Sequence, residues 1–458
     1  MSFTLKVGLE IHGYIKSAKK LFCNCDVVDE ATPNTHICPI CTGQPGSKPM
    51  LTNADALEKA IAIGLMLGCR INENLLFQRK HYSWPDSPNN FQRTMSGSYA
   101  VPVGENGTFE GIRITQVHLE EDPARWDPVT GEIDYNRAGT PLIEIVTEPD
   151  FTESEQVREW LQKLVTTLSY IKVLNKTAGI KSDVNVSISP DFERVEIKNV
   201  NSQSAIVEAI GVESKRQSLE KQAGNNIPMQ TRTYDSATKE TLFMRSKENA
   251  QDYMFIPDPD IPFITITPEF VAQLQESLPE TPSVKEANLK KLGVKDDDAQ
   301  VLSQEFELIV LFEKLAQKQI PIKTLVTYLR REAVGVANYH KKELADLVFD
   351  EVQIGELLTV LSQGKITDQT AREVFQTLLL KPFDVKSYIA EKGLLIIEDS
   401  SQLDTWCSET IAEQSKAVAD YKSGQENALN FLVGQVMKKS RGTAKVDVVK
   451  QKFIELLG

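Results

Sequence analysis

Apolar and polar residues alternate in several short runs of the first half of the chain. Alternation with a period of two is typical of strands that bury one face, so these runs predict β-strands. They cover residues 5–11, 111–117, 141–146, 184–188 and 194–197. We therefore expect a sheet in this half, with helical segments between its strands.

Two segments of the same half repeat apolar residues at the spacing of a helix. The first follows Thr52, whose side chain we expect to cap the helix, with Asp55 three residues on. The second follows a predicted capping box of Thr152 and Glu155. The apolar stripes consist of Leu57, Ile61, Leu65 and Gly68 in the first segment, and of Val157, Trp160, Leu161, Leu164, Leu168 and Ile171 in the second. Both stripes are expected to pack into a core.

Two stretches rich in proline, residues 256–262 and 278–282, mark a change in the character of the chain. Proline lacks the amide hydrogen that helices and sheets require. After about residue 285, segments rich in Leu, Glu and Lys continue at helical spacing almost to the end, with a second break near 392–402. We therefore predict an α+β chain with an N-terminal domain over 1–285, a helical domain over 286–400 and a small helical tail over 401–458.

The charge balance narrows the classes of function. Subtracting the 64 acidic residues from the 51 Lys and Arg residues gives a net charge of −13. General coating of duplex DNA depends on neutralising phosphates, so an acidic chain does not fit that class. Residues 438–452 run against this trend with a local excess of Lys and Arg. That excess fits either a solvated helix end or a contact with nucleic acid.

The sequence predicts neither a membrane span nor a secretory signal. The longest apolar stretch covers residues 60–69, which is shorter than the roughly 20 residues that a bilayer requires. The N-terminus lacks a basic region followed by an apolar one. We therefore expect a cytoplasmic protein.

Four of the six cysteines lie close together in the sequence as Cys23-x-Cys25 and Cys38-x-x-Cys41. In a cytosolic chain this clustering favours a metal over disulfides. Four thiolates suit the tetrahedral coordination of zinc, and a site closed by four protein ligands indicates a structural ion. The alternative is four free cysteines.

Acidic residues occur at strand positions where a single ion could collect them. Glu10 and His12 are two residues apart on the first predicted strand and so share a face, as do Asp183 and Asn185. Glu144 interrupts an otherwise apolar run, where a lone carboxylate is costly to bury unless it is paired or bound to metal. Oxygen ligands with an imidazole suit Mg²⁺ or Mn²⁺. The alternatives are ordinary surface charge and ion pairing, and for His12 a structural role.

The sequence contains none of the motifs G-x-x-x-x-G-K-[ST], G-x-G-x-x-G, H-E-x-x-H and G-x-S-x-G. If the protein uses a nucleotide, its phosphates must be held by metal and by basic side chains. Arg79, Lys80 and Lys198 are the candidates, although each could be an ordinary surface charge.

Several segments in order along the chain carry a resemblance to a known family. They are residues 7–12, 20–23, 43–46, Arg79-Lys80-His81-Tyr82-Ser83-Trp84-Pro85-Asp86, His118-Leu119-Glu120-Glu121-Asp122, 134–146, 183–187, 196–202 and 431–438. The chain resembles the B subunits of tRNA-dependent aspartyl/glutamyl amidotransferases over essentially its whole length.

The resemblance implies a cradle-shaped catalytic domain similar to glutamine synthetase, then a helical domain and a helical tail that binds tRNA. It implies ATP-dependent phosphorylation of the side-chain carboxylate of Glu on tRNA(Gln) or Asp on tRNA(Asn), followed by displacement of phosphate by ammonia. The implied partners are an amidase subunit that supplies the ammonia, a small third subunit, the misacylated tRNA and the non-discriminating aminoacyl-tRNA synthetase.

The resemblance also implies roles for individual residues. Catalysis would depend on Glu10, His12, Glu121 and Glu144. The Mg²⁺ ligands would be Glu10, His12, Glu120, Glu121, Glu144 and Asp183, and the zinc ligands Cys23, Cys25, Cys38 and Cys41. ATP or the other substrate would be bound by Arg79, Lys80, Asp86, Asn185, Lys198 and Asn201.

The chain departs from the bacterial members of this family in two places. Pro123-Ala124-Arg125 replaces Ala-Gly-Lys, and the acid that precedes the basic residue Lys181 is missing. These departures indicate an archaeal-type member. The large insertion of the Glu-specific archaeal relatives is absent between 286 and 400. A tRNA-binding scaffold without chemistry of its own remains the alternative function.

Overall fold

The computed structural model describes residues 3–28, 30–174, 180–200, 202–246, 254–396, 400–440 and 442–457. The chain divides into two compact units, Met1–Thr281 and Pro282–Gly458. The first boundary therefore lies four residues before the predicted one. The second unit contains both the predicted helical domain and the predicted tail, whose separation at residue 400 stays a prediction.

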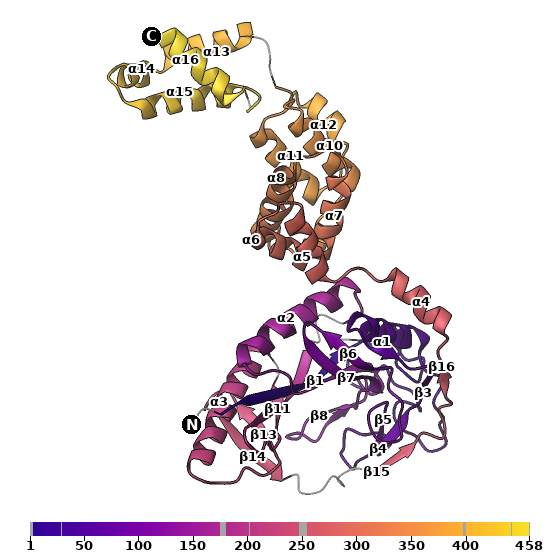
Figure 1. Ribbon diagram of the computed structural model, residues 1–458. Coiled ribbons are helices and arrows are strands. Elements are labelled where there is room, and N and C mark those ends of the chain that lie inside the picture. Colours follow the sequence, from indigo (N-terminus) through magenta and orange to yellow (C-terminus); the bar gives the residue numbers. More distant parts are fainter. Residues whose placement is uncertain are drawn as a thin grey trace. The chain divides into compact units, whose positions relative to one another are not determined.

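The first unit is built around a mixed sheet of twelve strands (Figure 1). The strands of this unit are β1 (Leu5–Tyr14), β2 (Arg70–Ile71), β3 (Asn74–Leu75), β4 (Gln78–His81), β5 (Phe91–Thr94), β6 (Gly104–Phe109), β7 (Ile112–Glu121), β8 (Arg125–Trp126), β9 (Ile133–Asp134), β10 (Pro141–Thr147), β11 (Ile180–Ile188), β12 (Val195–Val200), β13 (Gln230–Asp235), β14 (Glu240–Ser246), β15 (Met254–Pro257) and β16 (Ile264–Thr265). The sheet order is β14-β13-β12-β11-β1-β10-β7-β5-β4-β15, while β6 pairs with β7 and β2 pairs with β6. The five runs predicted as strands coincide with parts of β1, β7, β10, β11 and β12, except that β7 and β12 begin one residue later than predicted.

The central strands separate apolar residues from polar ones by alternation. On β1, Val7, Leu9 and Ile11 are buried in the core, whereas Glu10 and His12 lie on the other face. The neighbouring strands repeat this pattern, and the register aligns their polar positions with those of β1. The sheet therefore has one apolar face and one polar face.

Helices cover the apolar face. They are α1 (Ala54–Met66), α2 (Ser154–Tyr170) and α3 (Gln203–Gln222), and α4 (Pro268–Ser277) follows near the end of the unit (Figure 1). Both predicted stripes belong to α1 and α2 and contribute to the core cluster, with Trp160, Leu161 and Leu164 among the buried residues. The opposite face of the sheet carries polar side chains such as Glu10 and His12.

The predicted caps of these helices are wrong by one residue or more. Asn53, and not Thr52, caps α1 by accepting a hydrogen bond from the backbone N–H of Ala56 at 3.2 Å. At α2, Gln156 accepts the backbone N–H of Thr152 at 3.1 Å, so the predicted capping box does not form. At α1 a neighbouring polar side chain therefore satisfies an unpaired amide at the start of the helix, whereas at α2 the bonded amide precedes the helix.

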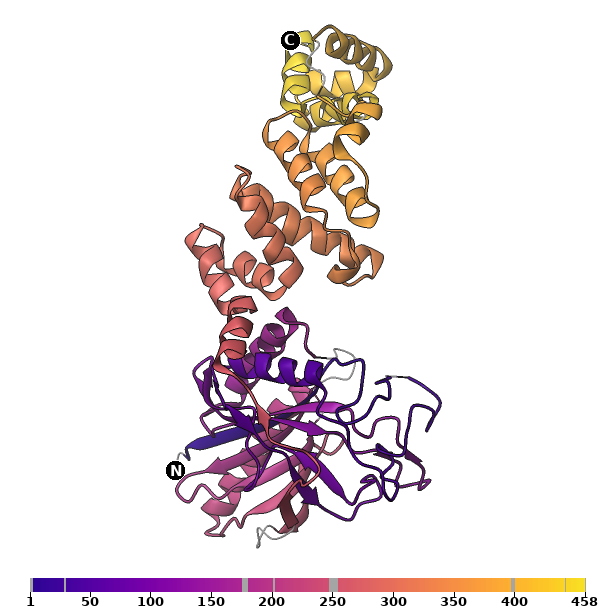
Figure 2. The same cartoon turned by 90° about the vertical axis from the view of Figure 1, so that its right-hand side faces the viewer.

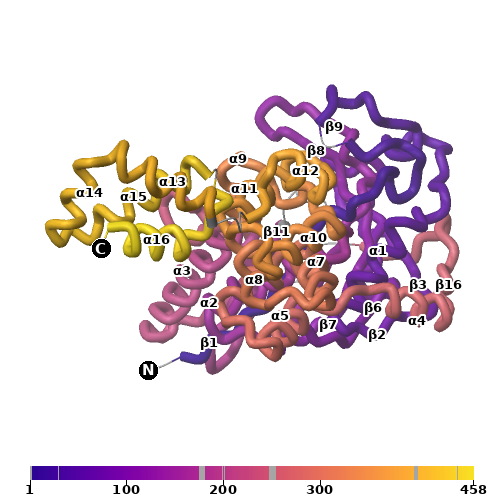
Figure 3. The backbone as a smooth tube through the Cα atoms, turned by 90° about the horizontal axis from the view of Figure 1, so that it is seen from above, coloured from indigo at the N-terminus to yellow at the C-terminus, as the bar shows by residue number. Residues whose placement is uncertain are grey.

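The described part of the second unit contains helices and connecting loops (Figure 2). Its helices are α5 (Pro282–Lys291), α6 (Asp296–Gln304), α7 (Phe306–Ala316), α8 (Ile322–Val326), the π-helix η1 (Thr327–Glu332), α9 (Ala333–His340), the 3₁₀-helix η2 (Leu344–Asp346), α10 (Glu351–Ser362), α11 (Asp368–Leu380), α12 (Val385–Glu391), α13 (Ser400–Glu413), α14 (Ser415–Lys422), α15 (Glu426–Lys439) and α16 (Val446–Leu457). The last four helices gather around a hydrophobic cluster of their own (Figure 3). No described helix is long and apolar enough to cross a membrane. The α+β class predicted from the sequence is confirmed.

Candidate active site

The polar face of the sheet brings titratable side chains from several strands together. The register places His12 of β1 opposite Glu144 of β10, and Glu144 opposite His118 of β7. Side chains two positions apart on a strand share a face, so Glu10 and Glu120 belong to the same surface. The alternation that buries the core residues thus also assembles this polar surface.

His12, Glu120 and Glu144 form the first acidic group on this face, which we call the histidine–carboxylate group. His12 Nε2 lies 3.5 Å from Glu120 Oε1 and 3.5 Å from Glu144 Oε1. One donor atom from each of the three residues lies within 4.8 Å of the other two. An imidazole and two carboxylates at this spacing suit a divalent cation such as Mg²⁺ or Mn²⁺.

The members of this group have shifted pKa values. Burial and the charge of Glu144 raise the pKa of Glu120. Burial also opposes the ionisation of Glu144, but its contacts with His118 and His12 hold its pKa well below the usual value. Burial lowers the pKa of His12, yet the hydrogen bond to Glu144 and the charges of both carboxylates outweigh it and raise the pKa to about 9. At neutral pH a protonated His12 therefore offsets part of the negative charge.

Glu10, Asp183 and Glu196 form a second acidic group beside the first, which we call the tricarboxylate group. One oxygen from each residue lies within 4.8 Å of the others. Lys198 Nζ lies 2.6 Å from Asp183 and 3.4 Å from Glu196. Burial lowers the pKa of Lys198, but the charges of Asp183 and Glu196 outweigh it, so the pKa is raised. A cationic side chain therefore already lies among these oxygens.

Asn185 extends the tricarboxylate group by one more oxygen. Its Nδ2 donates a hydrogen bond to Glu10 Oε1 at 3.1 Å, while its Oδ1 is buried without a hydrogen-bond partner among the described residues. Buried acceptors are normally satisfied. An unsatisfied oxygen next to three carboxylates fits a place for a cation or for a ligand that donates hydrogen bonds.

The four clustered cysteines also come together in space. One sulfur from each of Cys23, Cys25, Cys38 and Cys41 lies within 4.8 Å of the others. Cys41 Sγ lies 4.0 Å from Cys25 Sγ and 3.9 Å from Cys38 Sγ. This donor set and spacing fit a tetrahedral zinc ion.

A buried lysine lies beside this cluster. Lys20 is 1% exposed, and its Nζ donates to Cys41 Sγ at 3.4 Å and to the carbonyl of Tyr135 at 3.1 Å. The hydrogen bond from Cys23, the backbone N–H of Cys38 and the charge of Lys20 lower the pKa of Cys41 to about 4 against the effect of burial. Cys41 is therefore prepared to bind metal as a thiolate.

Comparison with known proteins identifies the family. The family model of the GatB/GatE catalytic domain matches residues 5–272, and that of the GatB domain matches residues 310–457. The chain belongs to the GatB family.

Curated GatB relatives cover the chain almost completely. It is 40% identical to the aspartyl/glutamyl-tRNA(Asn/Gln) amidotransferase B subunit of Methanococcus maripaludis (strain C7 / ATCC BAA-1331), with 98% of each chain covered. It is also 40% identical to the relatives of the same name from Methanocaldococcus jannaschii, over 99% of this chain and 97% of the relative, and from Methanothermobacter thermautotrophicus, over 98% and 100%. The family resemblance predicted from the sequence is confirmed.

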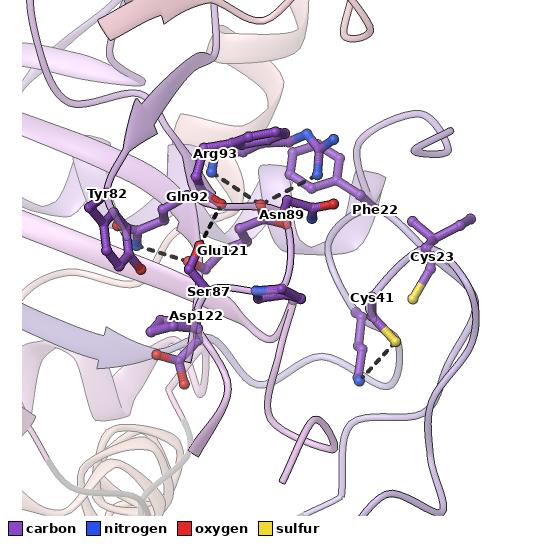
Figure 4. Close-up of a pocket in the computed structure, with 16 residues that line it drawn as sticks. Phe22, Cys23, Cys41, Tyr82, Ser87, Asn89, Gln92, Arg93, Glu121 and Asp122 are labelled. Atoms are coloured by element: carbon purple, nitrogen blue, oxygen red, sulfur yellow. Dashed lines mark hydrogen bonds and ion pairs between the residues drawn. The ribbon is translucent and has the colours of Figure 1, made fainter. Parts of the chain in front are cut away.

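Glu121 does not join the acidic groups of this GatB-family chain, in contrast to the sequence prediction. It follows Glu120 directly on β7 and therefore points to the other side of the strand. There it accepts the backbone N–H of Arg93 at 3.1 Å and lies 3.4 Å from Arg93 Nη1. Figure 4 shows Glu121 beside Arg93 in a pocket that Cys23 and Cys41 also line. Of the Glu-Glu pair, only Glu120 lies in the histidine–carboxylate group.

Arg79 is likewise engaged away from the polar face. Its Nη2 donates to Asp260 Oδ2 at 2.7 Å and to Asp258 Oδ1 at 3.2 Å. Arg93 donates to the second oxygen of Asp258 at 2.8 Å. The proline-rich stretch that contains both aspartates therefore holds Arg79 in ion pairs, and its role in binding ATP stays a prediction.

Lys80, Asp86 and Asn201 are also predicted to bind ATP or the other substrate, and their roles stay predictions. Lys80 lies opposite Gln92 in the register of β4 with β5, and its charge opposes the rise in the pKa of Glu120, so it acts on the histidine–carboxylate group. Asp86 has one buried oxygen without a hydrogen-bond partner among the described residues, and burial raises its pKa. Asn201 lies outside the described residues.

The sequence analysis missed three residues of these sites. His118 shares its strand face with Glu120, and Glu196 shares its face with Lys198, so alternation alone could have included both. Lys20 carries no such signal, because only the folded loops bring it to Cys41. For His118 and Glu196, the strand register adds only which residue of the neighbouring strand lies opposite each of them.

The basic segment of the tail is partly neutralised. Lys439 lies 3.0 Å from both Glu409 and Glu413, and Lys452 forms an ion pair with Asp404. Arg441 lies outside the described residues. From the sequence, this segment fits either a solvated helix end or a nucleic-acid contact, and these ion pairs account for part of its charge.

Proposed function

We propose that this chain is the ATP-dependent subunit of a tRNA amidotransferase. It would phosphorylate the side-chain carboxylate of Glu on tRNA(Gln) or Asp on tRNA(Asn), and ammonia would replace the phosphate to leave the amide. The names of the GatB relatives support this assignment. The observation that carries it is the convergence of His12, Glu120 and Glu144 on the polar face of the sheet.

The reaction explains why such a site needs acidic groups and no protein nucleophile. A carboxylate oxygen of the substrate attacks the γ-phosphorus of ATP, and ADP leaves. Ammonia then attacks the carbonyl carbon of the acyl phosphate, phosphate leaves and one proton is lost. The substrate and ammonia supply both nucleophiles, so the chain has only to bind, orient and neutralise charge.

The two acidic groups would hold two divalent cations. The histidine–carboxylate group supplies an imidazole and two carboxylates for one ion, and the tricarboxylate group supplies three carboxylates for another. A bound Mg²⁺ would neutralise the negative charge on the phosphate oxygens. This proposal divides the single ion site of the sequence analysis into two and leaves Glu121 out of both.

Basic side chains at the edges of these groups would contact the phosphates. Lys198 lies between Asp183 and Glu196, so it could move from carboxylate to phosphate oxygens when cations bind. Lys80 acts electrostatically on Glu120 from β4. Asn185 offers one unsatisfied oxygen beside Glu10, and the roles of Asp86 and Asn201 in substrate binding stay predictions.

The chain would act in the cytoplasm within a heterotrimer. An amidase subunit would produce the ammonia and a small third subunit would complete the enzyme, while the helical tail would bind the tRNA. Association with the non-discriminating aminoacyl-tRNA synthetase belongs to the same proposal. The four cysteines would hold one structural zinc ion, which metal analysis of the purified protein would detect.

The proposal is tested with the purified heterotrimer, each misacylated tRNA, ATP, Mg²⁺ and ammonium as the nitrogen source. His12→Ala and Glu120→Gln should abolish amide formation and leave the melting temperature close to that of the wild type. Glu58→Gln, on the surface of α1, is the matched control and should keep full activity. Full activity in the His12 and Glu120 variants would show that the acidic face has no catalytic role.

A scaffold without chemistry of its own is the competing interpretation, and truncation of the chain separates the two. If the chain carries the chemistry, removing the tail after about residue 400 should weaken tRNA binding but leave ammonia-dependent turnover at high tRNA concentration. If turnover stays absent when tRNA is saturating, the scaffold interpretation gains support.

A further inference from the structure

We infer that His118 is a positioning residue that holds Glu144 in the orientation needed to bind a cation together with His12. The inference rests on the proposed function, because it concerns the cation site of the histidine–carboxylate group. His118 lies on β7, two residues before Glu120, and is directly opposite Glu144 in the sheet register.

The two oxygens of Glu144 have different partners. Oε2 lies 2.6 Å from His118 Nδ1, whereas Oε1 lies 3.5 Å from His12 Nε2. The carboxylate is therefore fixed on one side by His118 and presents its other oxygen to His12 and Glu120. Rotation of Glu144 away from this group would break the shorter of these contacts.

The protonation of this pair follows from the chemistry of its members. A carboxylate oxygen accepts hydrogen bonds, and Glu144 Oε2 lies 2.6 Å from His118 Nδ1, so the ring nitrogen is the donor of this contact. His118 Nδ1 therefore carries a hydrogen and donates a hydrogen bond to Glu144 Oε2. Because this nitrogen is engaged, His118 acts on a cation through Glu144 and not as a ligand.

The ring of His118 is itself held in place. It is 2% exposed, and its Nε2 lies 2.9 Å from the side-chain amide of Gln116 on the same strand face, a group that offers both a donor and an acceptor. A carboxylate ligand supported by a buried, doubly anchored imidazole is prepared for its ion before the ion arrives. Removing a residue that orients a metal ligand through a hydrogen bond typically lowers metal affinity by about 10–100-fold.

The test measures Mn²⁺ binding to the purified heterotrimer without ATP, by electron paramagnetic resonance of the free ion. Two amide variants give a matched comparison. The amide nitrogen of His118→Asn can replace Nδ1, whereas that of His118→Gln corresponds to Nε2 and cannot reach Glu144 in the same way. We expect His118→Asn to bind within a few-fold of the wild type and His118→Gln to bind ~10–100-fold more weakly.

Activity gives a second measurement that a purely structural role would not reproduce. In His118→Gln, the Mg²⁺ concentration for half-maximal amidation should rise in parallel with the loss of affinity, while kcat at saturating Mg²⁺ should recover. His340→Ala, at the end of α9 in the second unit, serves as a histidine control that should change neither value.

The outcomes separate this inference from the proposed function. Equal affinities in the Asn and Gln variants would overturn the role of His118 while leaving the cation site intact. Failure of the wild type to bind Mn²⁺ would overturn the cation site and, with it, this inference. Weak binding in His118→Gln with recovery in His118→Asn supports both.

Discussion

His12 determines how the histidine–carboxylate group behaves in the absence of a cation. Its imidazole lies between two buried carboxylates, and its pKa is raised to about 9. At neutral pH the ring is therefore protonated and cannot donate a lone pair to a metal. A cation that binds to this group must first displace that proton.

Cation binding should consequently depend on pH. Below the pKa of His12, each unit of rising pH should increase the apparent Mn²⁺ affinity by up to about tenfold, and above about pH 9 the affinity should level off. Mn²⁺ titrations across this range measure the slope. In His12→Asn, which keeps an oxygen donor but no titrating ring, the slope should flatten; a persisting slope would assign the proton to another residue.

The charge of Lys20 should strengthen the binding of zinc by the four cysteines. Replacing it in Lys20→Met removes a buried cation 3.4 Å from Cys41 Sγ, so the pKa of that thiol should rise and zinc should be lost to a competing chelator more readily. Lys19→Met is the matched control, because Lys19 is 48% exposed and pairs with Asp26. Equal zinc retention in both variants would show that Lys20 has only a packing role.

At the scale of single residues, the sequence predicted which side chains share a face but not which faces meet. Alternation placed Glu10 with His12 and Asp183 with Asn185, and the strand register agrees. It could not choose between Glu120 and Glu121, because that choice depends on which side of β7 carries the polar surface. Arg79 shows a related limit, since its carboxylate partners lie about 180 residues away in the sequence.

At the scale of elements, α2 shows how one helix supports the site from the apolar side of the sheet. Its buried residues pack in the same core cluster as Val7 and Ile11 of β1, whose other face carries Glu10 and His12. A loss of packing against the apolar face of β1 would therefore shift the strand and, with it, the side chains of Glu10 and His12.

Leu164 and Val165 offer a direct comparison on this helix. Leu164 is fully buried, whereas Val165 is 39% exposed. Leu164→Ala should lower the free energy of unfolding by about 2–5 kcal/mol because it leaves a cavity, and Val165→Ala should change it by less than about 1 kcal/mol. Urea unfolding followed by circular dichroism measures both, and similar losses in the two variants would contradict the orientation of α2.

Helix existence was easier to predict than helix ends or short strands. The stripes of α1 and α2 each repeat over several turns, so packing reinforces the local signal. A cap depends on one side chain, and Asn53 competes with its neighbour Thr52 for the same amides. Strands such as β4 and β5 have only four residues each, with polar side chains that show no clear alternation.

At the scale of the whole molecule, the division of labour between the two units can be tested by separating them. The chain divides between Thr281 and Pro282, and each unit has buried residues of its own. We expect residues 1–281 and 282–458, produced separately, each to unfold cooperatively. Mn²⁺ binding and the four-cysteine cluster should stay with the first fragment, because all of their residues lie there. If the tail binds tRNA as proposed, fragment 1–281 should need a much higher tRNA concentration for amidation than the complete chain. Calorimetry, Mn²⁺ titration and the amidation assay on each fragment measure these expectations. If fragment 1–281 folds but binds no Mn²⁺, the cation site depends on the helical unit, and the assignment of the chemistry to the sheet alone is wrong.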